Sequence, residues 1–161
     1  MFSTLVSMAR QRDEFDGPRC LALLDLFAVS SDARRLVQRR LRSLGLTELQ
    51  FSMLITLLAV APSPSTPTGL ADSAGASCAS VTAALDDLQE RGLVVREHGV
   101  QDRRTRLVSL QTSGSRTAEK AATVILHLLC DIARPLEHQA PRVLHTLCDQ
   151  LASHATQICP G

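Results

Sequence analysis

The helix start and stop signals in the middle of the chain constrain its fold more than any other feature. Thr66 followed by Pro67 is typical of a helix start, because a threonine side chain caps free N–H groups and proline fits the first turn. Gly75 ends that helix, Ser77 caps another, and Arg91 with the glycine after it ends the second one. The apolar positions of the second helix lie at helical spacing, at Val81, Leu85 and Leu88. The pattern therefore predicts two short helices joined by a tight turn.

Apolar stretches on either side of an arginine-rich segment follow these helices. The stretch before it contains Leu93, Val94 and Val95, and the stretch after it contains Leu107, Val108 and Leu110. β-branched and apolar residues around a polar tip predict a two-stranded hairpin. Residues 99–110 read GVQDRRTRLVSL, and clustered arginine in solvent is typical either of a solvated face or of a surface that binds a polyanion. Two short helices and a hairpin in this order predict a winged helix-turn-helix.

Longer helices are predicted around this segment. A first helix ends near Gly45, and Thr47 with Gln50 forms a capping box for the next one. After the hairpin, an apolar helix covers 112–133 and a last helix runs over 141–158. Trp and Tyr are absent and Phe occurs four times, so burial must use Leu, Val, Ala and Ile, which suit packed helices and a seam between two chains.

From these features we expect a mainly α protein with a small β-hairpin wing. The 161 residues are too few for two comfortable domains. The expected single domain holds a winged helix-turn-helix over residues 46–111, dimerisation helices over 17–44 and 113–159, and mobile residues at 1–16.

The net charge is only +1, but arginine is concentrated in two stretches: Arg34, Arg35, Arg39, Arg40 and Arg42, then Arg91, Arg96, Arg103, Arg104 and Arg106. Local clusters can bind a polyanion when the average charge cannot. We interpret the first stretch mainly as a solvated face, with phosphate contact as the alternative. No signal peptide is evident and no apolar run reaches the ~18 residues of a membrane span. We therefore expect a cytoplasmic protein without a membrane partner.

Residues 45–121 resemble the MarR (multiple antibiotic resistance regulator) family. The resemblance is carried by GLTELQF, TPTGLADSAGAS, SVTAALDDLQERGLV and QDRRTRLVSLQTSG, and its most specific part is RGLV at residues 91–94 followed by DRR at 102–104. It implies a two-fold homodimer with interlocked terminal helices. Each recognition helix would enter a major groove of double-stranded DNA, and each wing tip would enter the adjacent minor groove. The implied function is a transcription regulator, a repressor that binds pseudo-palindromic sites.

The family motif assigns roles to the wing. Arg104 would be the minor-groove arginine, Asp102 would orient its guanidinium, and Arg103 and Arg106 would contact phosphates, with Arg96 as a further DNA contact. A narrow minor groove concentrates negative potential and favours arginine. The alternative is a solvated hairpin in which Asp102 and Arg104 only pair with each other.

The recognition helix departs from the family pattern, because Ala83 and Asp87 stand where long polar or basic residues are common. Its exposed first turns offer small groups to DNA: Ser77, Cys78, Ala79, Ser80 and Thr82. These groups cannot make bidentate purine contacts, so specificity should depend on groove shape and half-site spacing. Pure packing without DNA contact is the alternative for this helix, and it gains weight if Asp87 faces the groove.

We expect a small lipophilic or aromatic effector to release the DNA. Its candidate crevice is lined by Leu24, Phe27, Phe51, Leu54 and Ile55. Thiol oxidation is an alternative trigger with two candidates. Cys78 is near a helix N-terminus, which favours thiol reactivity, and Cys20 resembles in position the sensing cysteine of the organic-hydroperoxide-sensing branch of the family, although the tyrosines that usually assist that cysteine are absent here. The competing interpretations are a buried Cys20 and a Cys78 that is merely tolerated in a tight turn. A third possibility is a winged-helix dimer that serves only protein contacts.

The pattern H-x-x-C occurs twice, at His127 with Cys130 and at His145 with Cys148. Two imidazoles and two thiols suit zinc, but His and Cys on an apolar face usually belong to a core, so no metal or cofactor is expected. The chain has five cysteines, an odd number that argues against a disulfide framework. Since we find no phosphate loop, carboxylate pair or nucleophile triad, we expect no enzymatic activity.

Overall fold

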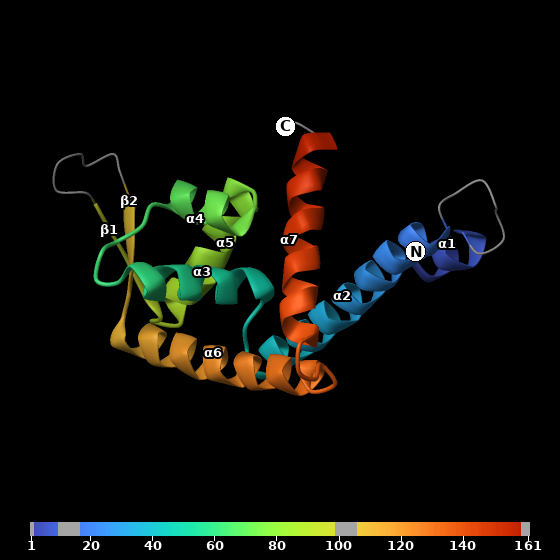
Figure 1. Cartoon of the computed structure of the whole chain (residues 1–161). Helices are drawn as coiled ribbons and strands as arrows, with labels where there is room; N and C mark the ends of the chain where they lie inside the picture. The colour runs from blue at the N-terminus through green and yellow to red at the C-terminus, as the bar shows by residue number, and fades with distance from the viewer. Residues whose placement is uncertain (1, 10–16, 99–105, 159–161) are drawn as a thin grey trace. The chain divides into compact units, whose positions relative to one another are not determined.

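The computed structural model describes residues 2–9, 17–98 and 106–158. The chain divides into two compact units, residues 1–126 and 127–161, and each is described by itself. Its elements are α1 (Phe2–Ala9), α2 (Gly17–Ser43), α3 (Glu48–Val60), α4 (Pro67–Ala74), α5 (Cys78–Glu90), β1 (Val94–His98), β2 (Arg106–Leu110), α6 (Thr112–Ala133) and α7 (Ala140–Ile158), as Figure 1 shows. The prediction of a mainly α fold with a small hairpin wing is confirmed.

The helix-turn-helix is formed by α4 and α5. The Thr66 hydroxyl accepts the Gly69 N–H at 3.1 Å at the start of α4. Gly75 ends that helix with φ at 58°, a left-handed conformation that glycine adopts without steric cost. The Ser77 hydroxyl then accepts the Ser80 N–H at 3.2 Å and starts α5. Both caps stand where the sequence predicts them.

The hairpin pairs β1 with β2 in antiparallel register, with Val94 opposite Leu110. A segment from before α4 joins its outer edge. Ser65 donates its N–H to the Val108 carbonyl at 3.0 Å and accepts the Val108 N–H at 2.8 Å. The loop between α3 and α4 is thereby fixed to the wing.

The core of the first unit lies among the end of α2, helices α3 to α5, the hairpin and the first part of α6. It consists of Leu41, Leu46, Met53, Leu54, Leu57, Leu70, Ala71, Val81, Leu85, Leu88, Leu93, Val94, Val108, Ala118, Ala121 and Ile125. The predicted inward positions of α5 are all buried. Because α5 packs against α3, α4 and β1, the core fixes which side of α5 remains at the surface.

Residues 1–16 were assigned no helix by the sequence analysis, which expects them to be mobile. The structure instead has α1 over Phe2–Ala9, packed against α2. The described part of this segment is therefore helical. The signal was weak because α1 is only eight residues long, and so short a helix depends on packing against a neighbour.

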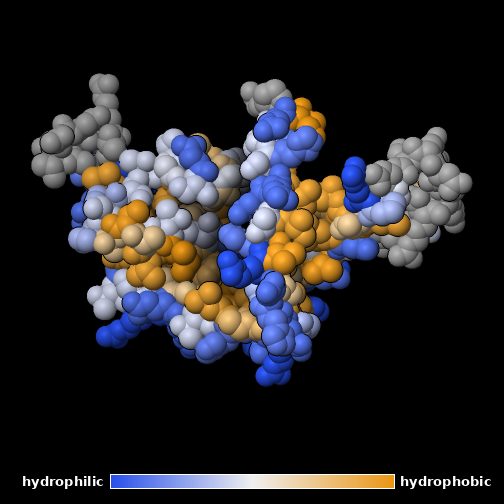
Figure 2. Space-filling model, viewed as in Figure 1, coloured by the Kyte–Doolittle hydropathy of each residue, from blue (hydrophilic) through white to orange (hydrophobic). Residues whose placement is uncertain are grey.

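Exposed apolar side chains lie along α2, at Leu23, Phe27, Val29 and Leu36. Figure 2 shows hydrophobic surface over this helix. In the second unit, α7 has no buried residue. Its exposed apolar residues are Val143, Leu144, Leu147, Leu151 and Ile158. Within the described residues no single helix has the length and apolar character of a membrane span, although α2 and α3 meet that test as a pair bent by 81°.

The start of α6 approaches the hairpin so closely that only glycine fits. A Cβ on Gly114 would lie 2.0 Å from the carbonyl oxygen of Leu93 and 2.9 Å from its carbonyl carbon. The same Leu93 oxygen accepts the Gln111 N–H at 3.0 Å. This contact joins the start of α6 directly to the residue that precedes β1.

We therefore expect Gly114→Ala to lower the free energy of unfolding by about 1–3 kcal/mol, since backbone must move to admit the methyl group. Gly17→Ala is the matched control, because nothing lies within 4 Å of its added Cβ. Urea unfolding of both variants measures the difference. Equal stability of Gly114→Ala and the parent would contradict the close contact.

Candidate nucleic-acid interface

The first two turns of α5 present small side chains to solvent. Cys78, Ala79, Ser80 and Thr82 are all exposed. The Thr82 hydroxyl donates to the Cys78 carbonyl at 2.9 Å, and the Ser80 hydroxyl lies 2.9 Å from that of Ser77. Because these hydroxyls are held close to the helix, few side-chain atoms project from this surface. The backbone of α5 can therefore approach a partner closely.

The rest of α5 carries charge of the wrong sign for a polyanion. The helix has three acidic residues, Asp86, Asp87 and Glu90, and neither lysine nor arginine. Unpaired carboxylates would repel phosphate. What these carboxylates contact therefore decides whether α5 can face nucleic acid.

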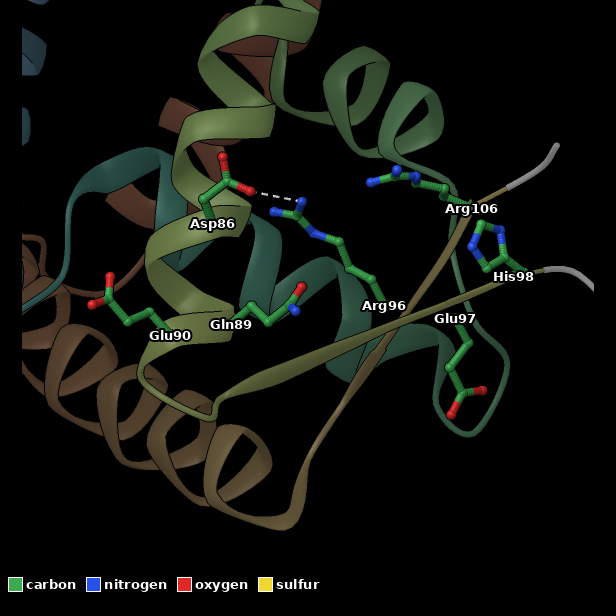
Figure 3. A pocket seen from close by; sticks show the side chains of 7 residues that line it. All are labelled: Asp86, Gln89, Glu90, Arg96, Glu97, His98 and Arg106. Atoms are coloured by element: carbon green, nitrogen blue, oxygen red, sulfur yellow. Dashed lines mark ion pairs between the residues drawn. The ribbon is translucent and has the colours of Figure 1, made fainter. Parts of the chain in front are cut away.

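Asp86 is paired with an arginine from the wing. Arg96 on β1 places Nη1 2.7 Å from the Asp86 Oδ1 and donates from Nη2 to the Thr82 carbonyl at 3.3 Å, and Figure 3 shows the ion pair. The Arg96 side chain is only 13% exposed. Its buried Nε has no hydrogen-bond partner in the part of the chain that the structure describes. The predicted role of Arg96 as a DNA contact is thus corrected to a tie between wing and helix.

Asp87 is turned toward α3. Its Oδ2 accepts from Gln50 Nε2 at 2.7 Å and from Arg91 Nη1 at 3.1 Å. The same Arg91 nitrogen donates to the Gly45 carbonyl at 2.9 Å. The carboxylate is therefore paired within the protein. The packing-only interpretation of α5 would gain weight from an Asp87 that faces the groove, and this contact gives it no such support.

A pocket of about 470 Å³ lies between α5 and the hairpin. It is lined by Asp86, Gln89, Glu90, Arg96, Glu97, His98 and Arg106 (Figure 3). Arg106 is exposed at the end of β2, opposite His98. Asp102, Arg103 and Arg104 lie outside the described residues, and their predicted roles stay predictions. The stem that leads to them is fixed on α5 by Arg96.

A second polar contact joins α2 to the start of α3. Glu48 accepts from Gln38 Nε2 at 2.8 Å and from Arg34 Nε at 2.9 Å. The Gln38 hydrogen bond and the Arg34 guanidinium hold the pKa of Glu48 below its ordinary value, against a smaller opposing effect of burial. Arg35 pairs with Asp32. Two arginines of the first basic stretch thus have acidic partners, which favours the solvated-face interpretation for them.

We expect this contact to make stability depend on acid pH. A carboxylate with a lowered folded pKa stabilises the fold above its unfolded pKa, and the stabilisation is lost as the pH falls through the folded value. The stability difference between the parent and Glu48→Gln should be largest at neutrality and shrink below the ordinary pKa of 4.5. Chemical unfolding over a pH series measures it. Gln38→Leu should remove part of the same dependence, and a pH-independent difference would contradict the assignment.

The candidate effector residues have unlike environments. Leu24, Phe51 and Ile55 are half-buried, and Phe27 is exposed. Leu54 is fully buried in the core, so its prediction as a crevice residue is corrected. It lies on the same side of α3 as Phe51 and Ile55, but within the buried face of that helix, where the core covers it completely. The other four stay a prediction.

The cysteine and histidine candidates lie at the surface. Cys20 and Cys78 are exposed and free, so Cys20 is not buried within a single chain. His127, Cys130, His145 and Cys148 are exposed as well, so none of them lies in the core of a single chain. Among the described residues no group of three or more metal-ligating side chains is assembled, and His145 Nε2 lies 3.4 Å from Asp149 Oδ2.

Sequence reasoning missed the contacts of Asp86 and Asp87 on α5. The Asp87–Arg91 pair has i, i+4 spacing, a signal that was available. The Gln50–Asp87 hydrogen bond joins residues 37 positions apart, and the Arg96–Asp86 pair needs the hairpin placed on α5. These last two contacts could not be found from sequence spacing alone.

These elements define the class of protein: α4, the tight turn, α5 and a paired hairpin make a winged helix-turn-helix. The MarR family model matches residues 44–105. The resemblance found in the sequence is confirmed over this segment, which is similar to the MarR family and has the winged helix-turn-helix fold.

Two kinds of relative support this assignment. The HTH-type transcriptional repressor YetL of Bacillus subtilis is 30% identical over 97 residues, which are 60% of this chain and 58% of YetL. A mutant of E. coli MarR in complex with operator DNA is 25% identical with a TM-score of 0.69, over 87% of this chain and 99% of that one. The MepR–DNA complex of S. aureus, 19% identical, shares the fold with a TM-score of 0.70 over 80% and 94%. YetL is by its name a transcriptional repressor, which is a regulator and not an enzyme.

Proposed function

We propose that this chain is a DNA-binding transcription regulator, a repressor that acts in the cytoplasm as a homodimer on pseudo-palindromic duplex sites. The observation that carries the proposal is the pairing of Asp86 with Arg96 and of Asp87 with Gln50 and Arg91. It leaves the small residues at the start of α5 exposed, while Asp86 and Asp87 further along the helix have partners within the protein. The similarity to E. coli MarR, whose mutant is solved with operator DNA, supports it.

The proposed contacts follow from the chemistry of each group. The first turn of α5 offers backbone N–H groups to a phosphate, and Ser80 and Thr82 are small enough to let the helix lie deep in a major groove. Arg104 enters the minor groove, Asp102 orients it, and Arg103 and Arg106 contact phosphates. With so few base-reading side chains on α5, groove shape and half-site spacing supply most of the specificity.

A second copy of the chain would cover the apolar surface of the terminal helices. No residue of α7 is buried within this chain, and a groove of about 490 Å³ on α7 is lined by Gln139, Arg142, Val143, Thr146, Leu147 and Gln150. Exposed apolar surface of this extent marks an association site. The effector of the proposed regulator is a small lipophilic or aromatic compound that changes the spacing of the two α5 helices.

Thiol oxidation is a second candidate trigger. Cys78 is the first residue of α5 and is exposed. An oxidised adduct at this position would stand on the surface proposed to meet DNA. Peroxide treatment of the parent and of Cys78→Ser, followed by DNA-binding measurements, separates this trigger from an organic effector.

We expect the purified protein to bind duplex DNA with strong salt dependence, because each neutralised phosphate releases counterions. Arg104→Ala should weaken binding to a selected genomic site and to a scrambled duplex alike, by roughly 1–3 kcal/mol, since the minor groove carries little sequence code. Affinity measured over a salt series tests both statements.

Arg96→Met is the matched control for the wing arginines. It should lower stability and keep the salt slope, because the Arg96 guanidinium is engaged by α5, whereas Arg106→Met should reduce the slope by about 1. No duplex bound at low salt would overturn the proposed function and favour a dimer that serves protein contacts.

The dimer is tested on α7. We expect Leu147→Glu to convert a dimer into a monomer at micromolar concentration, because the carboxylate would have to be buried in an apolar interface. Thr156→Glu is the control, since nine residues place it on the opposite side of the helix. Light scattering reads out the mass. A parent that is already a stable monomer would contradict the prediction.

A further inference from the structure

Four residues from three elements meet at one polar junction in the first unit. Gly45 lies in the turn between α2 and α3, Gln50 in the first turn of α3, and Asp87 and Arg91 at the end of α5. We call these four residues the junction cluster. It lies at the end of α5 away from the small exposed residues of the first turns.

Asp87 is the centre of the junction cluster. One of its oxygens, Oδ2, accepts hydrogen bonds from α3, through Gln50, and from Arg91 on its own helix. Arg91 continues the connection to the Gly45 carbonyl. The carboxylate therefore links α5 to the start of α3 directly. Through the Arg91 guanidinium it also links α5 to Gly45, in the turn that follows α2.

The junction is constrained on the α3 side. Gln50 is only 7% exposed, and its side chain is used at both ends, because Oε1 accepts the Thr47 N–H at 2.9 Å while Nε2 donates to Asp87. A buried amide held at both ends has one orientation. Asp87 thus meets a fixed donor.

The junction is constrained on the α2 side as well. The Leu46 N–H donates to the Leu41 carbonyl at 3.0 Å, and Gly45 has φ at 72°. The turn after α2 is therefore hydrogen-bonded back to the last turn of that helix. The far part of α2 carries the exposed apolar residues proposed to meet the second copy. Any rotation of α2 in the dimer moves the Gly45 carbonyl and with it Arg91.

We infer that Asp87 is a positioning residue that fixes the orientation of α5 relative to α2 and thereby sets the separation of the two recognition helices in the dimer. The inference rests on the proposed function, because it gives α5 a role on DNA. It explains an acidic residue on a helix proposed to approach phosphates. It also predicts that half-site spacing is read through Asp87, which itself contacts no DNA.

The test exchanges the polarity of the hydrogen bond. Gln50→Glu places two carboxylates against each other, and Gln50→Glu combined with Asp87→Asn restores one donor and one acceptor. Glu90→Gln is the matched control, since it removes an acidic charge from α5 outside the junction cluster. Binding is measured to selected sites whose half-site spacing is native, shortened or lengthened by about one base pair.

The parent should prefer the native spacing, and Gln50→Glu should reduce that preference by about tenfold, because Asp87 then no longer holds α5 to the start of α3, the helix that follows α2. The double variant should regain it, and Glu90→Gln should keep it while binding all spacings more tightly. A merely structural role would lower the melting temperature of Gln50→Glu and leave the spacing preference unchanged. That result would overturn the inference.

Hydrogen exchange separates failure of this inference from failure of the proposed function. If the parent binds no duplex, the proposed function is wrong, and the junction is judged on exchange alone. Amides of residues 44–50 and 87–92 should lose protection together in Gln50→Glu and regain it in the double variant. Loss in one segment without the other would overturn the link between α2 and α5.

Discussion

The carboxylates of α5 are the constraint on which the rest of the winged helix depends. A helix with three acidic residues and no basic one can approach a polyanion only if its charge is held elsewhere. Arg96 from the hairpin and Arg91 from the end of α5 meet two of the three carboxylates. These pairs lie partly in solvent, so each contributes little to stability. Their larger effect is on position, since Arg96 joins α5 to the hairpin and Arg91 joins the end of α5 to the Gly45 carbonyl in the turn after α2.

Both ties reach outward from a helix whose other side is completely buried. Val81, Leu85 and Leu88 are 0–1% exposed, and they fix the rotation of α5 about its axis. With that rotation set, Asp86 lies toward the wing and Asp87 toward α3. Core packing thus determines which carboxylate meets which arginine. The polar ties then limit the tilt that packing alone would leave free.

The elements predicted well from sequence are those whose signals are local. The hydroxyls of Thr47, Thr66 and Ser77 cap neighbouring N–H groups, so the starts of α3, α4 and α5 follow from the residues at those positions. Arg96, by contrast, looks like any exposed strand arginine until β1 is placed against α5. Leu54 lies on the same side of α3 as Phe51 and Ile55, but the core covers it completely and covers the other two only in part. Cys20 lies on an apolar helix whose face is exposed within one chain, so burial could not follow from periodicity.

The bridge between Ser65 and Val108 bears on how the molecule avoids aggregation. A two-stranded sheet has two open edges, and each can template the strand of another molecule. Ser65 occupies the outer edge of β2 at its centre, and Pro62, Pro64 and Pro67 around it have no N–H to offer a further strand. The remaining edge belongs to β1, where Arg96, Glu97 and His98 place charged and polar groups. The described part of the wing is therefore covered at the centre of one edge and poorly suited to strand addition on the other, so its strands need not recruit neighbouring molecules into a growing sheet.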